Sequence, residues 1–242
     1  MLEFLAVNPY VFFGIILLAS VLSTSFGIGG FVLIPLIAAA YGAREAIGII
    51  TLYFVFQNIN KGIAFRKHID WSVAIKMTLW SLPGALLGSF ALSFIPISIL
   101  NKILAIFILI YLANDVFEFV PKKHYSAALI PVFGTLYGFV SGLTSSGNII
   151  KGPLFTSLGL SKEAYNGTYA VSSFFVNVPK LVVYFVTGVI GVGSFTSALP
   201  FFAVSILGTY IGVHLLHRVK EDVFYYFLTF AFAASAIALL FA

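Results

Sequence analysis

Long apolar segments alternate with short polar ones along nearly the whole chain. After a first apolar run from Tyr10 to Tyr41, further runs follow at residues 46–65, 71–95, 98–120, 125–160, 164–188, 189–216 and 223–242. A helix needs about 20 apolar residues to cross the ~30 Å hydrocarbon core of a bilayer, and every run reaches that length. The pattern predicts an all-α polytopic membrane protein.

The first run, from Tyr10 to Tyr41, is too long for one span and too short for two. Its roughly 32 residues would form a helix of about 48 Å, whereas two full spans need roughly 40 residues. Gly27, Gly29 and Gly30 interrupt it, so we expect two half-helices that meet there in a broken or re-entrant segment. Irregular backbone at this depth is buried by protein or lines a polar cavity, and helix N-termini attract anions. The glycines therefore mark a candidate binding site.

This arrangement occurs a second time in the chain. Small and polar residues from Ser145 to Asn148 interrupt the run at 125–160, and Gly147 follows Gly29 by 118 residues. Other pairs with nearly the same separation are Pro35 with Pro153, Glu45 with Glu163, Asn58 with Asn177, Lys61 with Lys180, Gly84 with Gly208, and Gly88 with Gly212. An internal duplication accounts for all of them. We expect one integral membrane domain with a first repeat at 1–121 and a second at 122–242.

A family resemblance follows from these motifs. The signature Gly27-x-Gly29-Gly30-x-x-x-x-Pro35, repeated in altered form halfway along a strongly apolar chain of this length, resembles the TauE/SafE family of sulfite exporters. The second copy differs, because polar residues followed by Lys151 stand in place of a glycine cluster. The resemblance covers nearly the whole chain. It implies a membrane transporter whose substrate is sulfite or a sulfur-containing organic anion.

Composition narrows the class of protein further. The mean hydropathy of +1.09, with 61% hydrophobic and only 9% charged residues, excludes an ordinary soluble domain. The absence of cysteine excludes thiol, iron–sulfur and cysteine–zinc chemistry. The net charge of +5 is too small to indicate nucleic acid and is typical of loop charges that set membrane topology. We expect a multi-pass protein of the cell membrane, that is, the inner or plasma membrane.

The loop charges also indicate how the segments cross. If every segment crosses once, Lys and Arg residues divide four against five between the two sides. If both broken segments leave on the side they entered, one side holds Arg66, Lys67, Lys122, Lys123, Lys162, Arg218 and Lys220, and the other holds Arg44 and Lys102. Only this division obeys the positive-inside rule. It predicts inverted repeats, each with one broken or re-entrant segment and three spanning helices, around a midplane site.

Lysines supply the candidate binding chemistry. Lys151 follows the second break, and no acid lies near it in sequence. A buried cation is costly unless it is paired, so an anionic ligand could neutralise it. A distant acid, or snorkelling to an interface, is the alternative. Asn58 with Lys61, and Asn177 with Lys180, each place an amide and an ammonium group on one helix face, although Lys61 could also snorkel.

The predicted substrate-binding residues are Gly27, Gly29, Gly30, Asn58, Lys61, Ser145, Ser146, Gly147, Asn148, Lys151, Asn177 and Lys180. No carboxylate pair or activated nucleophile indicates an enzyme, and no ligand set indicates a metal or cofactor. Gly84 and Gly208, each followed by glycine four residues later, predict close helix packing.

Together these features predict a transporter that moves a small anion through a midplane site between the repeats. Its expected partners are that anion and the lipid bilayer, without nucleic acid, and a coupling ion, proton or sodium, is left open. An anion channel and a non-transporting membrane sensor or assembly subunit are the alternatives.

Overall fold

The computed structural model describes residues 9–26, 37, 43–96, 99, 127–220 and 223, and every regular element in these ranges is a helix. The helices are α2 (Pro9–Phe26), α4 (Ala43–Ala64), η1 (Arg66–His68), α5 (Trp71–Ala91), η2 (Ala127–Leu129), α7 (Ile130–Thr144), α8 (Asn148–Ser157), α9 (Lys162–Val186) and α10 (Val192–Arg218). Of these, α5, α9 and α10 are long and apolar enough to span a bilayer. The all-α prediction is confirmed, whereas the runs at 98–120 and 223–242 fall almost entirely outside the described residues.

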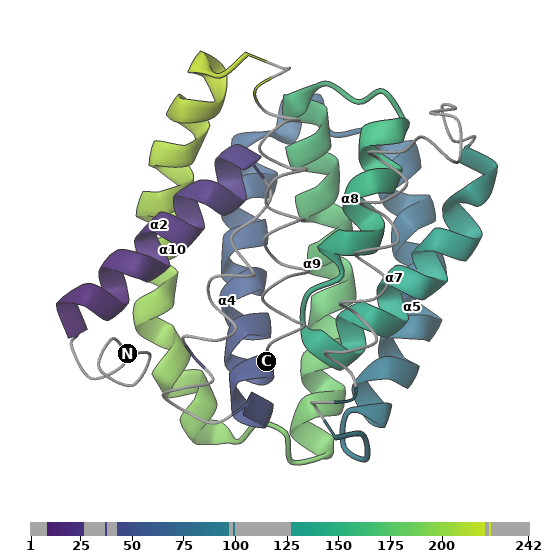
Figure 1. Cartoon of the computed structure of the whole chain (residues 1–242), viewed down its shortest axis with the longest axis vertical. Coiled ribbons are helices and arrows are strands. Elements are labelled where there is room, and N and C mark those ends of the chain that lie inside the picture. Colours follow the sequence, from purple (N-terminus) through teal and green to yellow (C-terminus); the bar gives the residue numbers. More distant parts are fainter. Residues whose placement is uncertain are drawn as a thin grey trace.

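Helices α4 and α9 lie side by side in the middle of the molecule and run in opposite directions (Figure 1). Gly48, near the start of α4, lies against Ile190, just beyond the end of α9. Gly167, near the start of α9, lies against Phe65, just beyond the end of α4. Because the start of each helix meets the end of the other, the pair is antiparallel.

On one flank, α5 packs along α7 at backbone distance. A side chain at Gly84 would collide with the backbone of Thr135, and one at Gly88 with that of Phe139. A side chain at Gly138, on α7, would likewise collide with the Ser81 carbonyl of α5. Residue numbers rise together along the contact, so α5 and α7 are parallel. The small residues let the two backbones approach, as the Gly84 pattern predicted.

The opposite flank repeats this contact between α10 and α2. Gly208 lies against Ser20, and Gly212 lies against Thr24, so these helices are also parallel. A Cβ at Gly212 would come 2.6 Å from the Thr24 Cβ. The close packing predicted for the Gly208 face is therefore confirmed.

Between α7 and α8 the chain reverses direction, and the break predicted in the second half is confirmed. Ser145 adopts a left-handed conformation (φ 66°) that ends α7, and its N–H donates to the Ser141 carbonyl at 2.9 Å. After the turn, Gly147 packs on the ring of Tyr137. Lys151, in α8, reaches the same ring, so α8 doubles back along α7 (Figure 1). The first predicted break, Gly27 to Gly30, lies outside the described residues.

Apolar packing fills the spaces between these helices. Ile16, Ile50 and Phe201 join α2, α4 and α10, while Tyr137 and Ile150 belong to a second cluster between α7, α8 and α9. Much of the outer surface is apolar as well, and the side chains Leu87, Val182, Val186, Leu207 and Tyr210 are more than half exposed. Large exposed apolar surfaces on long helices are what a surrounding bilayer requires.

Candidate functional site

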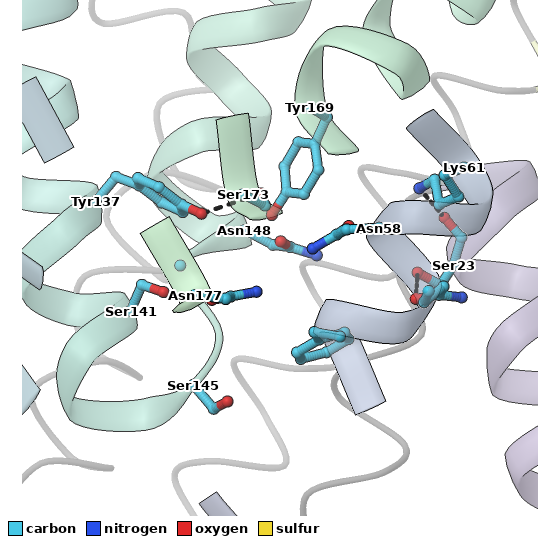
Figure 2. A pocket seen from close by; sticks show the side chains of 13 residues that line it. Ser23, Asn58, Lys61, Tyr137, Ser141, Ser145, Asn148, Tyr169, Ser173 and Asn177 are labelled. Atoms are coloured by element: carbon cyan, nitrogen blue, oxygen red, sulfur yellow. Dashed lines mark hydrogen bonds between the residues drawn. The ribbon is translucent and has the colours of Figure 1, made fainter. Parts of the chain in front are cut away.

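A polar cavity lies where α2, α4, α7, α9 and the break before α8 meet (Figure 2). About 20 Å³ of it admits the centres of water-sized molecules, and the cavity is partly open to the outside. Its lining residues are Ser23, Phe54, Gln57, Asn58, Lys61, Tyr137, Ser141, Ser145, Gly147, Asn148, Tyr169, Ser173 and Asn177. Among the described residues of this lining there is one cation and no carboxylate or histidine. The cavity therefore presents hydroxyl, amide and ammonium groups inside an apolar molecule.

Both halves of the chain contribute corresponding residues to the lining. Asn58 on α4 and Asn177 on α9 are separated by 119 residues, and both face the cavity. Ser23 on α2 and Ser141 on α7 are separated by 118 residues, and both also face it. The antiparallel contact of α4 with α9 brings these pairs to one place. The polar positions that the predicted duplication pairs thus converge on a shared cavity.

Lys61 is the cation in the cavity lining, and only 2% of its surface is exposed. Its Nζ donates to the Ser23 carbonyl at 2.8 Å and lies 5.8 Å from the Tyr169 ring centroid. The Ser23 hydroxyl donates in turn to the Gln57 side chain at 2.8 Å, and Gln57 donates to the Ser20 carbonyl at 3.1 Å. This network joins α2 to α4 and fixes Lys61 at the cavity rather than at an interface.

Lys151 is fully buried directly behind the cavity wall. Its Nζ donates to the Ser173 hydroxyl at 2.7 Å and to the Tyr169 carbonyl at 3.0 Å. Three ring centroids surround it, Tyr169 at 4.0 Å, Tyr137 at 4.7 Å and Phe155 at 5.2 Å. Aromatic faces attract a cation in such positions. Lys151 does not snorkel and is not itself among the lining residues.

Lys180 occupies a comparable position on α9, also fully buried and behind the lining. Its Nζ donates to the Ser141 hydroxyl and to the Asn177 side-chain oxygen, both at 2.9 Å. Within the described ranges, no carboxylate lies within ion-pair distance of Lys61, Lys151 or Lys180. In the described part of the chain, the three buried lysines therefore have neutral acceptors as partners, and Lys61 and Lys151 also lie near aromatic rings.

The break before α8 forms another part of the wall. Ser145 contacts the Thr51 hydroxyl across from α4, and it lines the cavity together with Gly147 and Asn148. No side chain caps the N-terminus of α8 at Gly147. The positive end of this helix therefore faces the cavity, which favours an anion there. Ser146 is buried but does not line the cavity, and its hydroxyl has no partner in the described part of the chain.

The structure thus brings together at the cavity most of the predicted site residues that it describes. Asn58, Lys61, Ser145, Gly147, Asn148 and Asn177 line it, whereas Lys151 and Lys180 lie one layer behind and Ser146 lies apart. Gly27, Gly29 and Gly30 lie outside the described residues. The binding roles of all these residues stay predictions.

Other lining residues were not anticipated from the sequence. They are Ser23, Phe54, Gln57, Tyr137, Ser141, Tyr169 and Ser173. The pair Ser23 and Ser141 carried a detectable signal, because its separation of 118 residues matches the duplication. Tyr137 and Tyr169 carried none, because aromatic residues are common in every segment of this chain.

The donor set suits an anion better than a metal. Among the described residues, no group of His, Asp and Glu side chains could hold a metal ion. Lysine ammonium groups, a helix N-terminus and amide nitrogens are donors, and they match negative oxygens.

The comparisons agree with this geometry. The sulfite exporter TauE/SafE family matches residues 12–239, which is nearly the whole chain. None of the curated proteins and none of the solved structures matches the chain. The polytopic helical fold and this extensive match lead to one conclusion: the chain belongs to the sulfite exporter TauE/SafE family, a family of membrane transporters.

Proposed function

We propose that the protein transports a small anion through the cavity between α4 and α9. The observation that carries the proposal is a buried polar lining with Lys61 and the α8 N-terminus, and with no carboxylate among the residues that the structure describes. An anion that enters loses its hydration, and these donors replace it. A cation of similar size would meet like charge and no anionic ligand.

The proposed scaffold is a pair of inverted repeats, residues 1–121 and 122–242. The antiparallel contact of α4 with α9 supports it, since these helices are equivalent in the duplication. The matched contacts of α5 with α7 and of α10 with α2 support it further. Secondary transporters of this kind place the substrate near the midplane, at the interface between the repeats. The cavity has residues from both repeats in its wall.

The proposed substrate is sulfite or a sulfur-containing organic anion, and the proposed location is the inner or plasma membrane. The family name supports the sulfur chemistry. The lining supports a small, negatively charged group that accepts several hydrogen bonds.

Transport by purified protein in proteoliposomes tests the proposal. We expect saturable uptake of radiolabelled sulfite or of a small sulfonate, above the level of protein-free liposomes. Uptake of small carboxylates is measured in the same way. Uptake of sodium in the absence of these anions is measured as the cation control. If none of these anions enters faster than into protein-free liposomes, the proposed function is wrong.

A further inference from the structure

Two of the buried lysines touch the cavity only through intermediate residues. Lys151 donates to the Ser173 hydroxyl at 2.7 Å, and Lys180 donates to the Ser141 hydroxyl at 2.9 Å. Ser173 and Ser141 line the cavity, whereas the two lysines do not. Each serine therefore stands between an ammonium group and the space that an anion would occupy.

We propose that Lys151 and Lys180 recognise the anion indirectly, by orienting Ser173, Ser141 and Asn177 so that their hydrogens face the cavity. The inference rests on the proposed function and specifies how the site selects its substrate. Under it, Lys151 and Lys180 are positioning residues, and the neutral side chains that they orient contact the anion together with Lys61. The hypothesis that Lys151 itself touches the anion is replaced by this arrangement.

The orientation follows from a count of donors and acceptors. An ammonium group has three hydrogens and no lone pair, so it can only donate. The serine oxygen that accepts from it must direct its own hydrogen elsewhere. For Ser173 that hydrogen goes into the cavity, to the Tyr137 hydroxyl at 3.1 Å, or to the Tyr169 hydroxyl, which also lines the cavity. In the second case, Tyr137, which also lines the cavity, keeps its own hydrogen free to donate.

The same count of donors and acceptors applies to the side-chain amide of Asn177. Its side-chain oxygen accepts from Lys180 at 2.9 Å, which leaves the amide NH2 as the group available to the cavity. In Figure 2 the amide nitrogen of Asn177 points toward the space between the labelled side chains. Lys180 therefore orients two lining residues, Ser141 and Asn177, as donors. Lys151 orients the hydroxyls of Ser173 and Tyr137.

This arrangement predicts a selectivity that a bare ammonium site would not have. Oriented hydroxyl and amide donors are left unpaired by an anion that accepts hydrogen bonds poorly, and buried unpaired donors are costly. Sulfite and carboxylates accept strongly, whereas thiocyanate and perchlorate carry the same sign of charge but accept weakly. We expect thiocyanate to compete at least about tenfold less well than a transported sulfite or sulfonate.

Competition on the wild-type protein is the first test and needs no variant. Liposomes that accumulate the labelled anion are titrated with thiocyanate and with unlabelled substrate, and the two inhibition constants are compared. The expected result is the tenfold preference for the strong acceptor. Equal or stronger competition by thiocyanate overturns the inference, even though uptake itself would still support the proposed function.

A double-mutant cycle between Lys151 and Ser173 is the second test. We expect Ser173→Ala to weaken the apparent affinity about tenfold or more, since it removes a bond to a charged ligand. Lys151→Met should weaken it in the wild-type background but add little once Ser173 is alanine. Effects that multiply in the double variant, or an unchanged affinity of Ser173→Ala, overturn the inference.

A neighbouring serine provides the matched control. Ser172 is also fully buried on α9, but its hydroxyl donates to the Thr168 carbonyl of the same helix at 2.6 Å, and it does not line the cavity. Ser172→Ala should leave the affinity and the thiocyanate preference unchanged. Thermal melting in detergent shows that each variant is folded before its affinity is compared.

Discussion

Replacing Lys61 by methionine separates binding from folding more cleanly than any other change at the site. Lys61 is the cation that lines the cavity, and only 2% of its surface is exposed. Methionine keeps most of the lysine stem and removes the ammonium group. The change therefore deletes one charge from the wall without opening a large void.

The magnitude follows from the contacts of Lys61. A charge-assisted hydrogen bond to a buried anion contributes ~1.5 to 3 kcal/mol, which corresponds to a ten- to hundredfold weaker apparent affinity at ~1.4 kcal/mol per decade. The free energy of unfolding should change less than the free energy of anion binding. The Ser23 carbonyl loses its donor at 2.8 Å, a cost of roughly 1 to 3 kcal/mol, while the desolvation cost of a buried, unpaired ammonium group disappears. These two terms oppose each other.

Uptake kinetics in proteoliposomes measure the apparent affinity for the anion, and thermal melting in detergent measures the stability of the fold. Lys76→Met is the matched control, because Lys76 is an exposed lysine on α5. Lys61→Arg retains the charge and should recover part of the affinity. The expected result is a large rise in the concentration for half-maximal uptake for Lys61→Met alone, with melting temperatures close to that of the wild type.

An unchanged affinity in a folded Lys61→Met variant would refute this reasoning. It would mean that the anion does not approach Lys61 and that the lining between Ser141 and Asn177 provides the contacts. A large loss of melting temperature would refute the energetic argument instead. It would show that the bond to Ser23 contributes more to folding than the buried charge costs.

Two further predictions concern glycines. Gly138→Ala should lower the melting temperature by several degrees, because its Cβ would lie 2.9 Å from the Ala85 nitrogen and against the Ser81 carbonyl, and overpacking costs roughly 1 to 3 kcal/mol. Gly14→Ala is the control, because the space around its Cβ is open. Equal melting temperatures of the two variants would contradict the close packing of α5 with α7. Gly147→Ala should displace the Tyr137 ring from the cavity wall and slow anion uptake, and wild-type uptake kinetics would show that the wall tolerates the shift.

The sequence predicted the helical segments well because apolar runs and breaks depend on local composition. The second break is an example, since Ser145 to Asn148 interrupt an apolar run and do end α7 before α8 begins. The packing role of Gly84 and Gly208 was equally accessible, because glycine spacing directly limits how closely backbones approach.

The composition of the cavity was predictable only in part. The spacing of Asn58 with Lys61, and of Asn177 with Lys180, correctly assigned each pair to one helix face. It could not show that Lys61 lines the cavity while Lys180 turns to Ser141, because that depends on the rotation of α9 against α7. In helices that are apolar on several sides, the sequence alone does not distinguish the face toward lipid from the face toward a cavity.

The difference between the two repeats is as informative as their likeness. Lys151 corresponds to Leu33 at a separation of 118 residues, so of the two predicted repeats only the second has a lysine at this position. Its three aromatic neighbours, Tyr137, Phe155 and Tyr169, correspond at the same separation to Ala19, Ile37 and Thr51, none of which is aromatic. The cation and the rings that surround it are thus present together in one repeat and absent together from the other.

That joint occurrence has a physical reason. A buried ammonium group without a carboxylate partner is tolerated only where acceptors and aromatic faces replace its hydration, and Ala19, Ile37 and Thr51 offer no aromatic face. A duplicated scaffold supplies equivalent amides, Asn58 and Asn177, from both sides of the cavity. The aromatic surroundings of Lys151 then place an additional positive charge behind one wall. In the proposed site, a small anion would therefore lie near Lys61 of the first predicted repeat, while Lys151 of the second acts through Ser173.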